Sequence, residues 1–227
     1  MIITIDGAVA TGKSSVARDL ANALGYIFFD TGAMYRSITY GILHNNISLD
    51  DEKALKKYLD SFDFDMKIKQ GEKYYYVEGR DVTNIIRGLD VTEKVSAVAA
   101  IPKVREKLVE IQRELAMGVN AVFEGRDMGT VVFPNADLKI FLTGRPEIRA
   151  KRRFDELKER FPDMADQLSF EKVLDDLNKR DEFDSSRQIS PLKAAEDAYI
   201  IDTSDMTCEQ VVDKVLECKD RRKYRLG

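Results

Sequence analysis

The feature that most constrains the fold is an apolar strand that runs into a glycine-containing loop and then into a helix. An apolar run opens the chain, and the sequence GAVATGKS follows it at residues 7–14. The spacing of its two glycines and of Lys13 and Ser14 matches the Walker A pattern, in which backbone N–H groups and the lysine bind phosphate and the hydroxyl can bind Mg²⁺. A glycine turn without a ligand is the alternative. The complete motif in its strand and helix context favours a phosphate-binding loop.

The segment after this loop has the pattern of an amphipathic helix. Val16, Leu20 and Leu24 fall on one face, and Gly25 is a natural residue to end the helix. The N-terminus of such a helix favours a bound anion. Within the loop, Ala10 is less free than glycine to take a positive φ, so a left-handed backbone there would be strained.

Composition limits the classes of protein to which the chain can belong. Its 227 residues are 44% hydrophobic, enough for one substantial core with insertions. The net charge of -4 argues against a general nucleic-acid-binding surface. Cys208 and Cys218 lie ten residues apart and His44 is the only histidine. These counts argue against a disulfide framework and a Ser-His-Asp triad, and they exclude a multi-histidine metal site.

The sequence shows no pattern of a targeting or membrane segment. The N-terminus lacks a charged region followed by a long apolar run, and no stretch approaches the ~18 apolar residues of a membrane helix. We therefore expect a soluble cytoplasmic protein that acts as a monomer, with neither a membrane nor a nucleic-acid polymer as partner.

Short apolar runs predict the strands of one sheet. They lie near residues 2, 27, 122, 139 and 199 and are separated by helical patterns. Strands that alternate with helices indicate an α/β fold with a doubly wound five-stranded parallel sheet. We expect a single domain over residues 1–227.

A different pattern interrupts this alternation between residues 62 and 77. Phe62, Phe64 and Met66 alternate with polar residues, and a turn at residues 70–72 leads into a tyrosine-rich run. This pattern predicts a small antiparallel hairpin, inserted at about residues 60–90, with a structural role.

Two further signals predict the starts of helices. Asp90 and Glu93 have the spacing of a capping box. Pro102 suits the first position of the next helix, whose apolar face would carry Val104 and Leu108.

Polar residues follow two of the predicted strands, at the ends where α/β sheets bind ligands. Residues 30–32 follow the strand near residue 27, and a helix expected over residues 33–43 carries Tyr35 and Arg36 in its first turn. Glu124 closes the strand near residue 122, where a metal-organising carboxylate is expected in a Walker A protein.

The first of two charged clusters lies early in residues 145–187, the most charged part of the chain. Arg149, Arg152 and Arg153 share one face of a helix that should end near Pro162. A solvated surface and an anion site are equally good interpretations of this cluster.

The second charged cluster places Arg180, Asp184 and Arg187 on one helix face. Surface salt bridges, each contributing only ~0.3–0.5 kcal/mol, are the alternative interpretation. Together with Arg36 and Arg126, these arginines are more cations than one polyphosphate requires. We infer a second phosphate site, which suits phosphoryl transfer because positioning and charge neutralisation carry the rate of that reaction.

Several segments resemble the bacterial cytidylate kinases, and the resemblance runs almost end to end. Its most specific part is the run GRDMGT at residues 125–130. The family usually has Gly-Pro at the start of the phosphate loop and a glycine at the position of Ala10, and this chain departs from both. The matching segments are residues 7–15, 30–36, 104–106, 124–134 and 180–187.

The resemblance implies a P-loop nucleoside monophosphate kinase core, a monophosphate-binding insert that contains the hairpin, and a mobile helical lid over about residues 145–176. It implies an acceptor site in three parts: Arg36, Arg126 and Arg187 on the phosphate; Ser96, Arg105, Asp127 and Arg187 on the cytosine; Arg180 and Asp184 on the ribose. Thr31 and Tyr35 are expected in the same acceptor site.

On the donor side, Lys13, Arg126, Arg152 and Arg153 are the expected catalytic residues. Ser14 is the expected Mg²⁺ ligand. The residues expected to bind ATP are Gly7, Ala8, Val9, Ala10, Thr11, Gly12, Lys13, Ser14, Ser15 and Arg149.

The expected activity is phosphorylation of CMP and dCMP to the diphosphates, dependent on ATP and Mg²⁺, by direct in-line transfer. The nearest alternative is another small-molecule kinase on the same core, of the shikimate or adenylate kinase type. Such an enzyme would not need a cytosine-reading pair such as Arg105 and Asp127. A nucleotide switch that binds GTP is the alternative from a different class, and a nucleotide panel distinguishes it.

Overall fold

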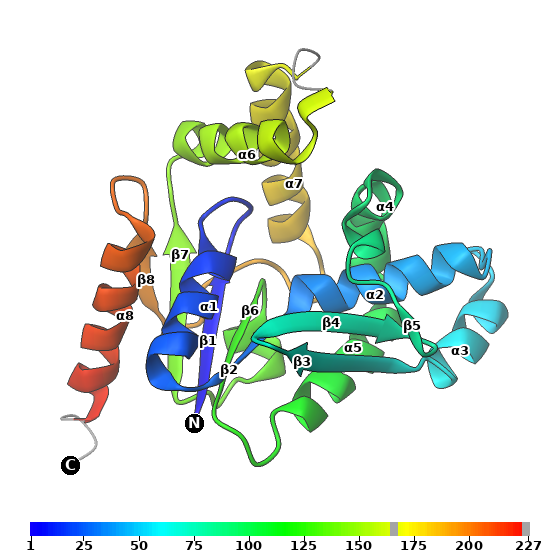
Figure 1. Ribbon diagram of the computed structural model, residues 1–227, viewed down its shortest axis with the longest axis horizontal. Coiled ribbons are helices and arrows are strands. Elements are labelled where there is room, and N and C mark those ends of the chain that lie inside the picture. Colours follow the sequence, from blue (N-terminus) through cyan, green and yellow to red (C-terminus); the bar gives the residue numbers. More distant parts are fainter. Residues whose placement is uncertain (164–167, 224–227) are drawn as a thin grey trace. The chain divides into compact units, whose positions relative to one another are not determined.

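A computed structural model describes residues 1–163 and 168–223, and it divides into two compact units (Figure 1). One unit consists of Met1–Phe29 and Ala116–Gly227, and we call it the sheet unit. The other consists of Asp30–Leu115, and we call it the hairpin unit. The hairpin expected near residues 60–90 lies within the hairpin unit.

The sheet unit is built on a five-stranded sheet with the order β2-β6-β1-β7-β8. Strand β1 pairs in parallel with β6 and β7, and β7 pairs in parallel with β8. The predicted doubly wound parallel sheet is therefore confirmed, at all five expected positions. The strands are β1 (Ile2–Gly7), β2 (Ile27–Asp30), β6 (Ala121–Gly125), β7 (Leu138–Thr143) and β8 (Tyr199–Asp202).

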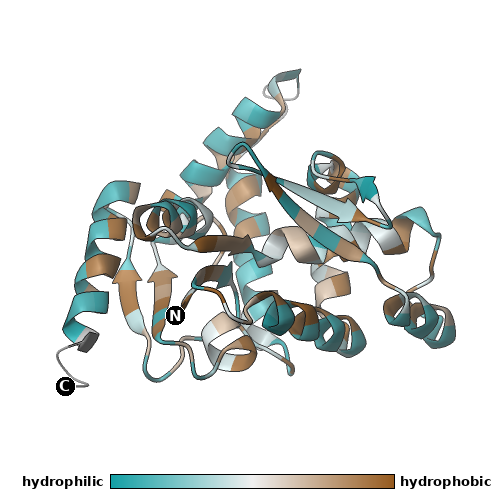
Figure 2. Ribbon diagram, turned by 60° about the horizontal axis from the view of Figure 1, so that its bottom comes forward, coloured by the Kyte–Doolittle hydropathy of each residue, from teal (hydrophilic) through white to brown (hydrophobic). Residues whose placement is uncertain are grey.

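Four α-helices and one short π-helical turn accompany this sheet among the described residues. Helices α1 and α8 pack against each other, as Figure 1 shows. Figure 2 colours the strands largely brown and α8 in alternating teal and brown, as expected for a helix with one buried face. The elements are α1 (Lys13–Leu24), η2 (Met128–Val132), α6 (Pro146–Arg160), α7 (Phe170–Ser186) and α8 (Cys208–Lys223).

The core of the sheet unit explains the apolar patterns. Ile3 and Ile5 of β1 are fully buried in one cluster with Val16 and Leu20 of α1 and with residues of α8. Helix α1 ends where the sequence predicts, because Gly25 takes a left-handed φ of 66° that lets its N–H reach the last carbonyl groups of the helix.

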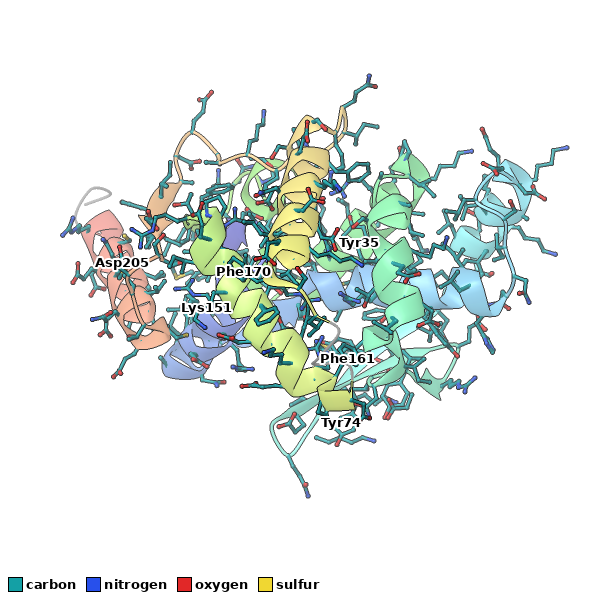
Figure 3. The ribbon with its side chains drawn as sticks, turned by 90° about the horizontal axis from the view of Figure 1, so that it is seen from above. Tyr35, Tyr74, Lys151, Phe161, Phe170 and Asp205 are labelled. Carbon is teal, nitrogen blue, oxygen red and sulfur yellow. The ribbon has the colours of Figure 1, made fainter. Side chains whose placement is uncertain are left out.

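Helices α6 and α7 cover the segment for which a lid was expected, residues 145–176. Phe154 of α6 meets Phe170 of α7 edge to face, with ring centroids 6.1 Å apart. Figure 3 shows Lys151 and Phe161 toward opposite ends of α6 and labels Phe170 at the start of α7. Residues 164–167 of the expected lid lie outside the described residues.

The hairpin unit combines a three-stranded antiparallel sheet with four α-helices and one 3₁₀ turn among the described residues. Strands β3 and β4 pair with Phe64 opposite Val77, which confirms the predicted hairpin. Ile38, Ile86 and Leu108 are fully buried in its core. The elements are α2 (Thr31–His44), α3 (Glu52–Asp60), β3 (Phe64–Lys69), β4 (Glu72–Val77), β5 (Arg80–Asp81), η1 (Ile85–Arg87), α4 (Leu89–Ala99) and α5 (Pro102–Leu115).

Two predicted helix starts need correction. The helix expected from Ala33 begins at Thr31, because the Asp30 carboxylate caps it by accepting the N–H of Ala33 at 2.9 Å. The capping box predicted at Asp90 is wrong, because α4 begins before Asp90, at Leu89, and its cap is Gly88. Asp90 instead lies in the first turn, where its charge favours the helix dipole.

Among the described residues, no helix has both the length and the apolar composition needed to cross a membrane.

Candidate active site

The phosphate loop joins the buried end of β1 to the start of α1. A Cβ at Gly7 would lie 2.5 Å from the carbonyl oxygen of Leu142, so glycine is required where β1 passes the backbone of β7. Gly12 has a left-handed φ of 86° directly before α1, and Ala10 has a φ of 57°. The loop therefore does adopt the left-handed conformation at Ala10 that the sequence identified as a source of strain.

Several side chains hold the phosphate loop in this shape. The Thr11 hydroxyl and the Lys13 ammonium both donate to the carbonyl oxygen of Ala8, at 3.0 and 3.2 Å. The Thr203 hydroxyl, from the loop after β8, donates to the carbonyl oxygen of Thr11 at 3.1 Å. These bonds go to carbonyl oxygens of the loop and not to its N–H groups, which are the groups that bind phosphate in loops of this kind.

A hydroxyl and a carboxylate meet beside the start of α1. The Oγ of Ser14 donates to the Oε1 of Glu124 at 2.8 Å, and Glu124 is buried at the end of β6. No group of three or more His, Cys, Asp or Glu side chains that could hold a metal exists among the described residues. Ser14 and Glu124 nevertheless fit Mg²⁺, which is usually held by one or two protein oxygens together with substrate phosphates and water.

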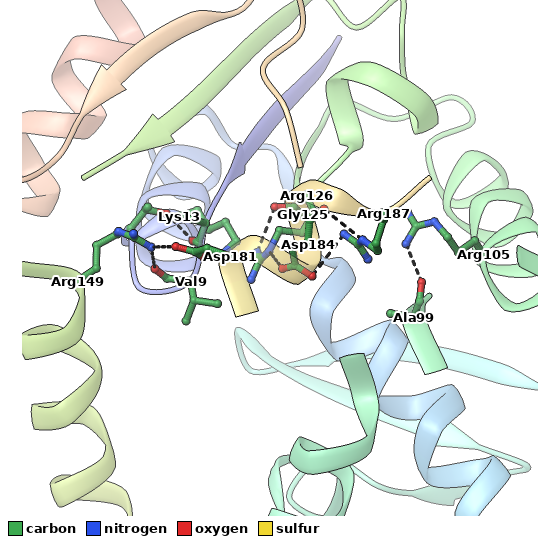
Figure 4. Close-up of polar contacts among 12 residues, drawn as sticks. Val9, Lys13, Ala99, Arg105, Gly125, Arg126, Arg149, Asp181, Asp184 and Arg187 are labelled. Atoms are coloured by element: carbon green, nitrogen blue, oxygen red, sulfur yellow. Dashed lines mark hydrogen bonds and ion pairs between the residues drawn. The ribbon is translucent and has the colours of Figure 1, made fainter. Parts of the chain in front are cut away.

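The three arginines expected on one face of α6 have different environments. Arg149 is buried, donates to the carbonyl oxygens of Gly144 and Val9, and forms a 2.6 Å ion pair with Asp181 of α7 (Figure 4). Its bond to Val9 ties α6 directly to the phosphate loop. The interpretation as a solvated surface is therefore wrong for Arg149.

Arg152 and Arg153 of α6 differ from Arg149 and from each other. Arg152 donates to the hydroxyl of Thr203 at 3.0 Å and to its carbonyl oxygen at 2.6 Å, so it shares Thr203 with the phosphate loop. Arg153 forms a 2.8 Å ion pair with Glu156 of the same helix. Arg153 therefore has the local partner that the surface interpretation predicts.

The second charged cluster is a buried network around one carboxylate. Asp184, which is 5% exposed, accepts from Nε of Arg126 at 3.0 Å and forms an ion pair of 3.5 Å with Arg187. Figure 4 shows Arg126, Asp184 and Arg187 in this network. The alternative of exposed surface salt bridges is wrong for Asp184. Arg180 is half-buried one turn earlier on α7.

The segment after β6, residues 126–134, carries two expected acceptor residues, and we call it the acceptor loop. It holds Arg126 and the buried side chain of Asp127. The Asp6 carboxylate at the end of β1 accepts the N–H groups of Met128 and Gly129, both at 2.8 Å. Burial raises the pKa of Asp6 to about 7, although the two N–H bonds oppose this shift.

The expected acceptor residues of the hairpin unit gather around α2. Arg36 donates to the hydroxyl of Thr92 at 2.7 Å and to the carbonyl oxygen of Ile86 at 3.3 Å. Arg105 of α5 is buried, donates to the carbonyl oxygen of Ala99 at 3.0 Å, and places its guanidinium 5.3 Å from the ring centroid of Tyr35. The structure therefore brings Tyr35 and Arg105 together in a cation–π contact.

Two further expected acceptor residues lie on α2 and α4 of the hairpin unit. Thr31 is buried as the first residue of α2, and Ser96 is half-buried on α4.

Comparison with known proteins decides which family this arrangement represents. The family model described as cytidylate kinase matches residues 3–221. The chain belongs to the cytidylate kinase family. The cytidylate kinase of Protochlamydia amoebophila is 60% identical over 225 residues, which cover 99% of each chain. That of Caldicellulosiruptor bescii is 46% identical over 215 residues, 95% of this chain and 93% of the relative.

Solved structures with little sequence identity share the cytidylate kinase fold seen here. Shikimate kinase from Bacteroides thetaiotaomicron superposes with a TM-score of 0.51 at 15% identity, over 97% of this chain and 98% of that one. An uncharacterized protein from Eubacterium ventriosum gives a TM-score of 0.53 at 14% identity, over the same shares. These likenesses support the fold alone.

Sequence reasoning missed three residues that this cytidylate kinase site uses as supports. Asp6 holds the acceptor loop, Thr203 joins the phosphate loop to Arg152, and Asp181 holds Arg149. Asp6 lies at the carboxyl end of β1, and Thr203 directly follows β8. The rule that ligand-site residues follow parallel strands could have found both.

Proposed function

We propose that this protein transfers the γ-phosphoryl group of ATP to CMP and dCMP and releases ADP and the nucleoside diphosphate. The observation that carries the proposal lies in the sheet unit of this cytidylate kinase family member. The phosphate loop follows β1. Arg126 follows the neighbouring strand β6 and joins Asp184 and Arg187 in the charged network. One sheet edge thus provides two sets of groups for anions, as a donor and an acceptor phosphate need.

The transfer itself requires little covalent chemistry from the protein. An oxygen of the acceptor phosphate attacks the γ-phosphorus in line, the bond to the bridging oxygen of ADP breaks, and the acceptor needs no general base because it is already ionised. Lys13 and the loop N–H groups neutralise charge on the transferred group, joined by Arg126, Arg152 and Arg153. Arg149 supports the ATP-binding loop through its bond to Val9.

Mg²⁺ is the proposed metal, with ATP as co-substrate. Ser14 would hold it, and Glu124 accepts a hydrogen bond from Ser14 and so orients its hydroxyl. When bound, the metal neutralises charge on the β- and γ-phosphate oxygens.

The acceptor roles divide between the two units. In the sheet unit, Arg126 and Arg187 are proposed to bind the acceptor phosphate, and Arg180 and Asp184 the ribose. Asp127 is proposed to read the base. In the hairpin unit, the proposed acceptor residues are Thr31, Tyr35, Arg36, Ser96 and Arg105.

Hydrogen-bond polarity supports cytosine as the base. Cytosine presents an amine donor beside two acceptors, N3 and O2, whereas uracil presents a carbonyl oxygen and an N–H at the first two positions. A carboxylate such as Asp127 with donors such as Arg105 and Ser96 suits the cytosine pattern. Uracil would leave desolvated groups unpaired at a cost of ~1–3 kcal/mol each.

The decisive experiment measures ATP turnover against a panel of CMP, dCMP, UMP, AMP and shikimate. We expect kcat/KM for CMP to exceed that for UMP by at least ~10²-fold, because sites built on hydrogen bonds reject mismatched analogues strongly. Comparable efficiency on CMP and UMP would remove the base-reading roles. Turnover on shikimate or AMP alone would replace the proposed function with that of another kinase.

The alternative of a GTP-binding switch has one sequence feature in its favour. Residues 178–181 read Asn-Lys-Arg-Asp, the spacing of the guanine-recognition motif Asn-Lys-x-Asp. The structure places this run inside α7, where Asp181 is committed to Arg149 and Lys179 pairs with Asp175. The same panel, extended to GTP binding, tests this alternative.

A further inference from the structure

The acceptor loop is fixed at both ends by charged side chains from neighbouring strands. At its start, Asp6 of β1 accepts the N–H groups of Met128 and Gly129, one on each carboxylate oxygen. At its end, the buried ammonium of Lys139 on β7 donates to the carbonyl oxygen of Pro134 at 2.6 Å. The shape of this loop is therefore set by side chains that lie outside it.

The bonds of Asp6 reach the peptide unit that positions Asp127. The carbonyl oxygen of Asp127 accepts the N–H of Val131 at 2.9 Å, and the N–H of Met128, in the same peptide unit, donates to Asp6 at 2.8 Å. Both polar ends of the peptide that follows Asp127 are thus held. Because a fixed peptide plane fixes the adjoining backbone angle of Asp127, it also fixes the direction in which that side chain leaves the backbone.

A role in strand pairing alone does not account for Asp6. Its backbone already takes part in the ladder, opposite Gly125 of β6 and Phe141 of β7, and the carboxylate adds no bond to either strand. Asp6 is only 4% exposed, and a buried carboxylate opposes folding unless its bonds compensate. Those bonds are charge-assisted, and both go to the acceptor loop.

We propose that Asp6 is a positioning residue for the acceptor nucleotide: its carboxylate holds the peptide after Asp127, so that Asp127 is aimed at the base of the acceptor. The inference rests on the proposed function, which assigns Asp127 to the acceptor. It predicts an effect on the acceptor that is separable from any effect on ATP, although Asp6 directly precedes the phosphate loop.

The test is steady-state kinetics of the full-length Asp6→Asn variant with CMP and ATP varied separately. Asparagine keeps one acceptor oxygen but turns an NH₂ group toward the second N–H, so one charge-assisted bond is lost. We expect KM for CMP to rise ~10-fold or more, with KM for ATP within ~2-fold of wild type, from the loss of a hydrogen bond to a charged group. Equal rises in both KM values, or no rise for CMP, would overturn the proposal.

Asp137→Asn is the matched control. The Asp137 carboxylate also accepts a backbone N–H of β1, that of Ile2 at 2.6 Å, but at the opposite end of the strand. Asparagine can still accept this bond but without the charge, and this weakening should leave both KM values within ~2-fold of wild type. A rise in KM for CMP equal to that of Asp6→Asn would show that any loosening of β1 suffices, and it would refute a specific role for Asp6.

A double-mutant comparison tests whether Asp6 acts through Asp127. In an Asp127→Ala background, Asp6→Asn should raise KM for CMP by less than ~3-fold, because the group that it positions is gone. If the two fold-changes simply multiply, Asp6 does not act through Asp127 and the proposal fails.

Gly129→Ala provides a second approach if Asp6→Asn does not fold. A Cβ there would lie 3.0 Å from the Thr4 hydroxyl and 3.2 Å from the Lys139 side chain, a contact tight enough to shift the Gly129 backbone and the N–H that it donates to Asp6. The expected result is again a raised KM for CMP with unchanged KM for ATP, and an unchanged KM for CMP would overturn the proposal. Wild-type enzyme that fails to phosphorylate CMP would instead remove the proposed function itself.

Discussion

The phosphate loop and the acceptor loop follow neighbouring strands of one sheet, yet they are held in different ways. In the phosphate loop, left-handed conformations at Ala10 and Gly12 set the path and Thr11 and Lys13 bond back to the carbonyl oxygen of Ala8, while Thr203 and Arg149 add bonds from outside the loop. In the acceptor loop, the supports are charged side chains of other strands, Asp6 of β1 and Lys139 of β7.

This difference decides whether a sequence motif reveals the groups that hold each loop. It also decides how each loop responds to substitution. A loop shaped largely by its own backbone requires particular residues at fixed spacing, so a motif reveals it. For a loop shaped by distant charges, no spacing rule reveals the supports: the run GRDMGT marks the acceptor loop itself but not its partners Asp6 and Lys139. Substitutions in the phosphate loop should therefore act on the chemistry or on local strain, whereas substitutions around the acceptor loop should act on acceptor recognition.

The largest effect is expected from Lys13→Ala, which removes a charge from the phosphate loop. We expect kcat to fall by ~10³-fold, because the lysine neutralises charge that develops in the transition state. Thermal unfolding should show an intact fold. Lys151→Ala is the control, since that lysine is exposed on α6 and forms an ion pair with the exposed Asp155 of the same helix. Near wild-type turnover in Lys13→Ala would mean that this loop does not bind the transferred phosphate.

Within the acceptor loop, Asp127 should control selectivity instead of the rate of transfer. Asp127→Ala should shrink the preference for CMP over UMP from at least ~10²-fold to a few-fold, chiefly through lost CMP activity. Competition assays with both nucleotides measure this ratio directly. Asp205→Ala removes an exposed carboxylate, seen in Figure 3, and should leave the ratio unchanged. An unaltered ratio in Asp127→Ala would assign base reading to other residues.

A third effect is the pH dependence of stability that Asp6 introduces. Burial raises the pKa of Asp6 from 3.8 to about 7, against the N–H bonds of Gly129 and Met128; the charge of Asp127 raises it further and that of Arg126 lowers it. Because the pKa is higher in the folded state, protonation of Asp6 stabilises the fold. This stabilisation is complete below about pH 3.8 and is lost as the pH rises through about 7.

Urea unfolding of wild type and Asp6→Asn between pH 4 and pH 7 measures this contribution. The wild-type free energy of unfolding, relative to the variant, should fall by about 1 kcal/mol per pH unit across this window. Asp137→Asn, tested in the same way, should follow the wild type. A difference between wild type and Asp6→Asn that does not change with pH would show that Asp6 ionises normally.

The fold could be predicted from the sequence because its signals are local. The five apolar runs, the alternation around Phe64 and the proline at residue 102 each mark an element that the structure contains. The prediction failed at the start of α4: Asp90 offers the spacing of a capping box, but the helix begins before it, at Leu89.

The candidate site could be predicted only in part, because spacing identifies a helix face but not what that face contacts. Arg149, Arg152 and Arg153 share a face, yet one is buried against Asp181, one is held by Thr203 and one pairs within its own helix. The partners Asp181 and Thr203 are distant in sequence. Only the packing of α6 against α7 and its contact with the loop after β8 reveal them.

The smallest effect is the one that tests whether the phosphate loop stores strain in its own backbone. Ala10 has a φ of 57°, and a left-handed conformation costs an L-residue roughly 1–2 kcal/mol. Glycine removes this cost but adds about 0.5–1 kcal/mol of conformational entropy to the unfolded chain. Ala10→Gly should therefore raise the free energy of unfolding by about 0.5–1 kcal/mol, with KM for ATP within ~2-fold of wild type.

Ala8→Gly is the matched control, because Ala8 is not among the described residues with positive φ. It should have the opposite sign, a loss of about 0.5–1 kcal/mol, since only the entropy changes. Equal losses of stability in both variants would show that Ala10 is not strained, and the contrast between a loop shaped by its backbone and one shaped by distant charges would then rest on the acceptor loop alone.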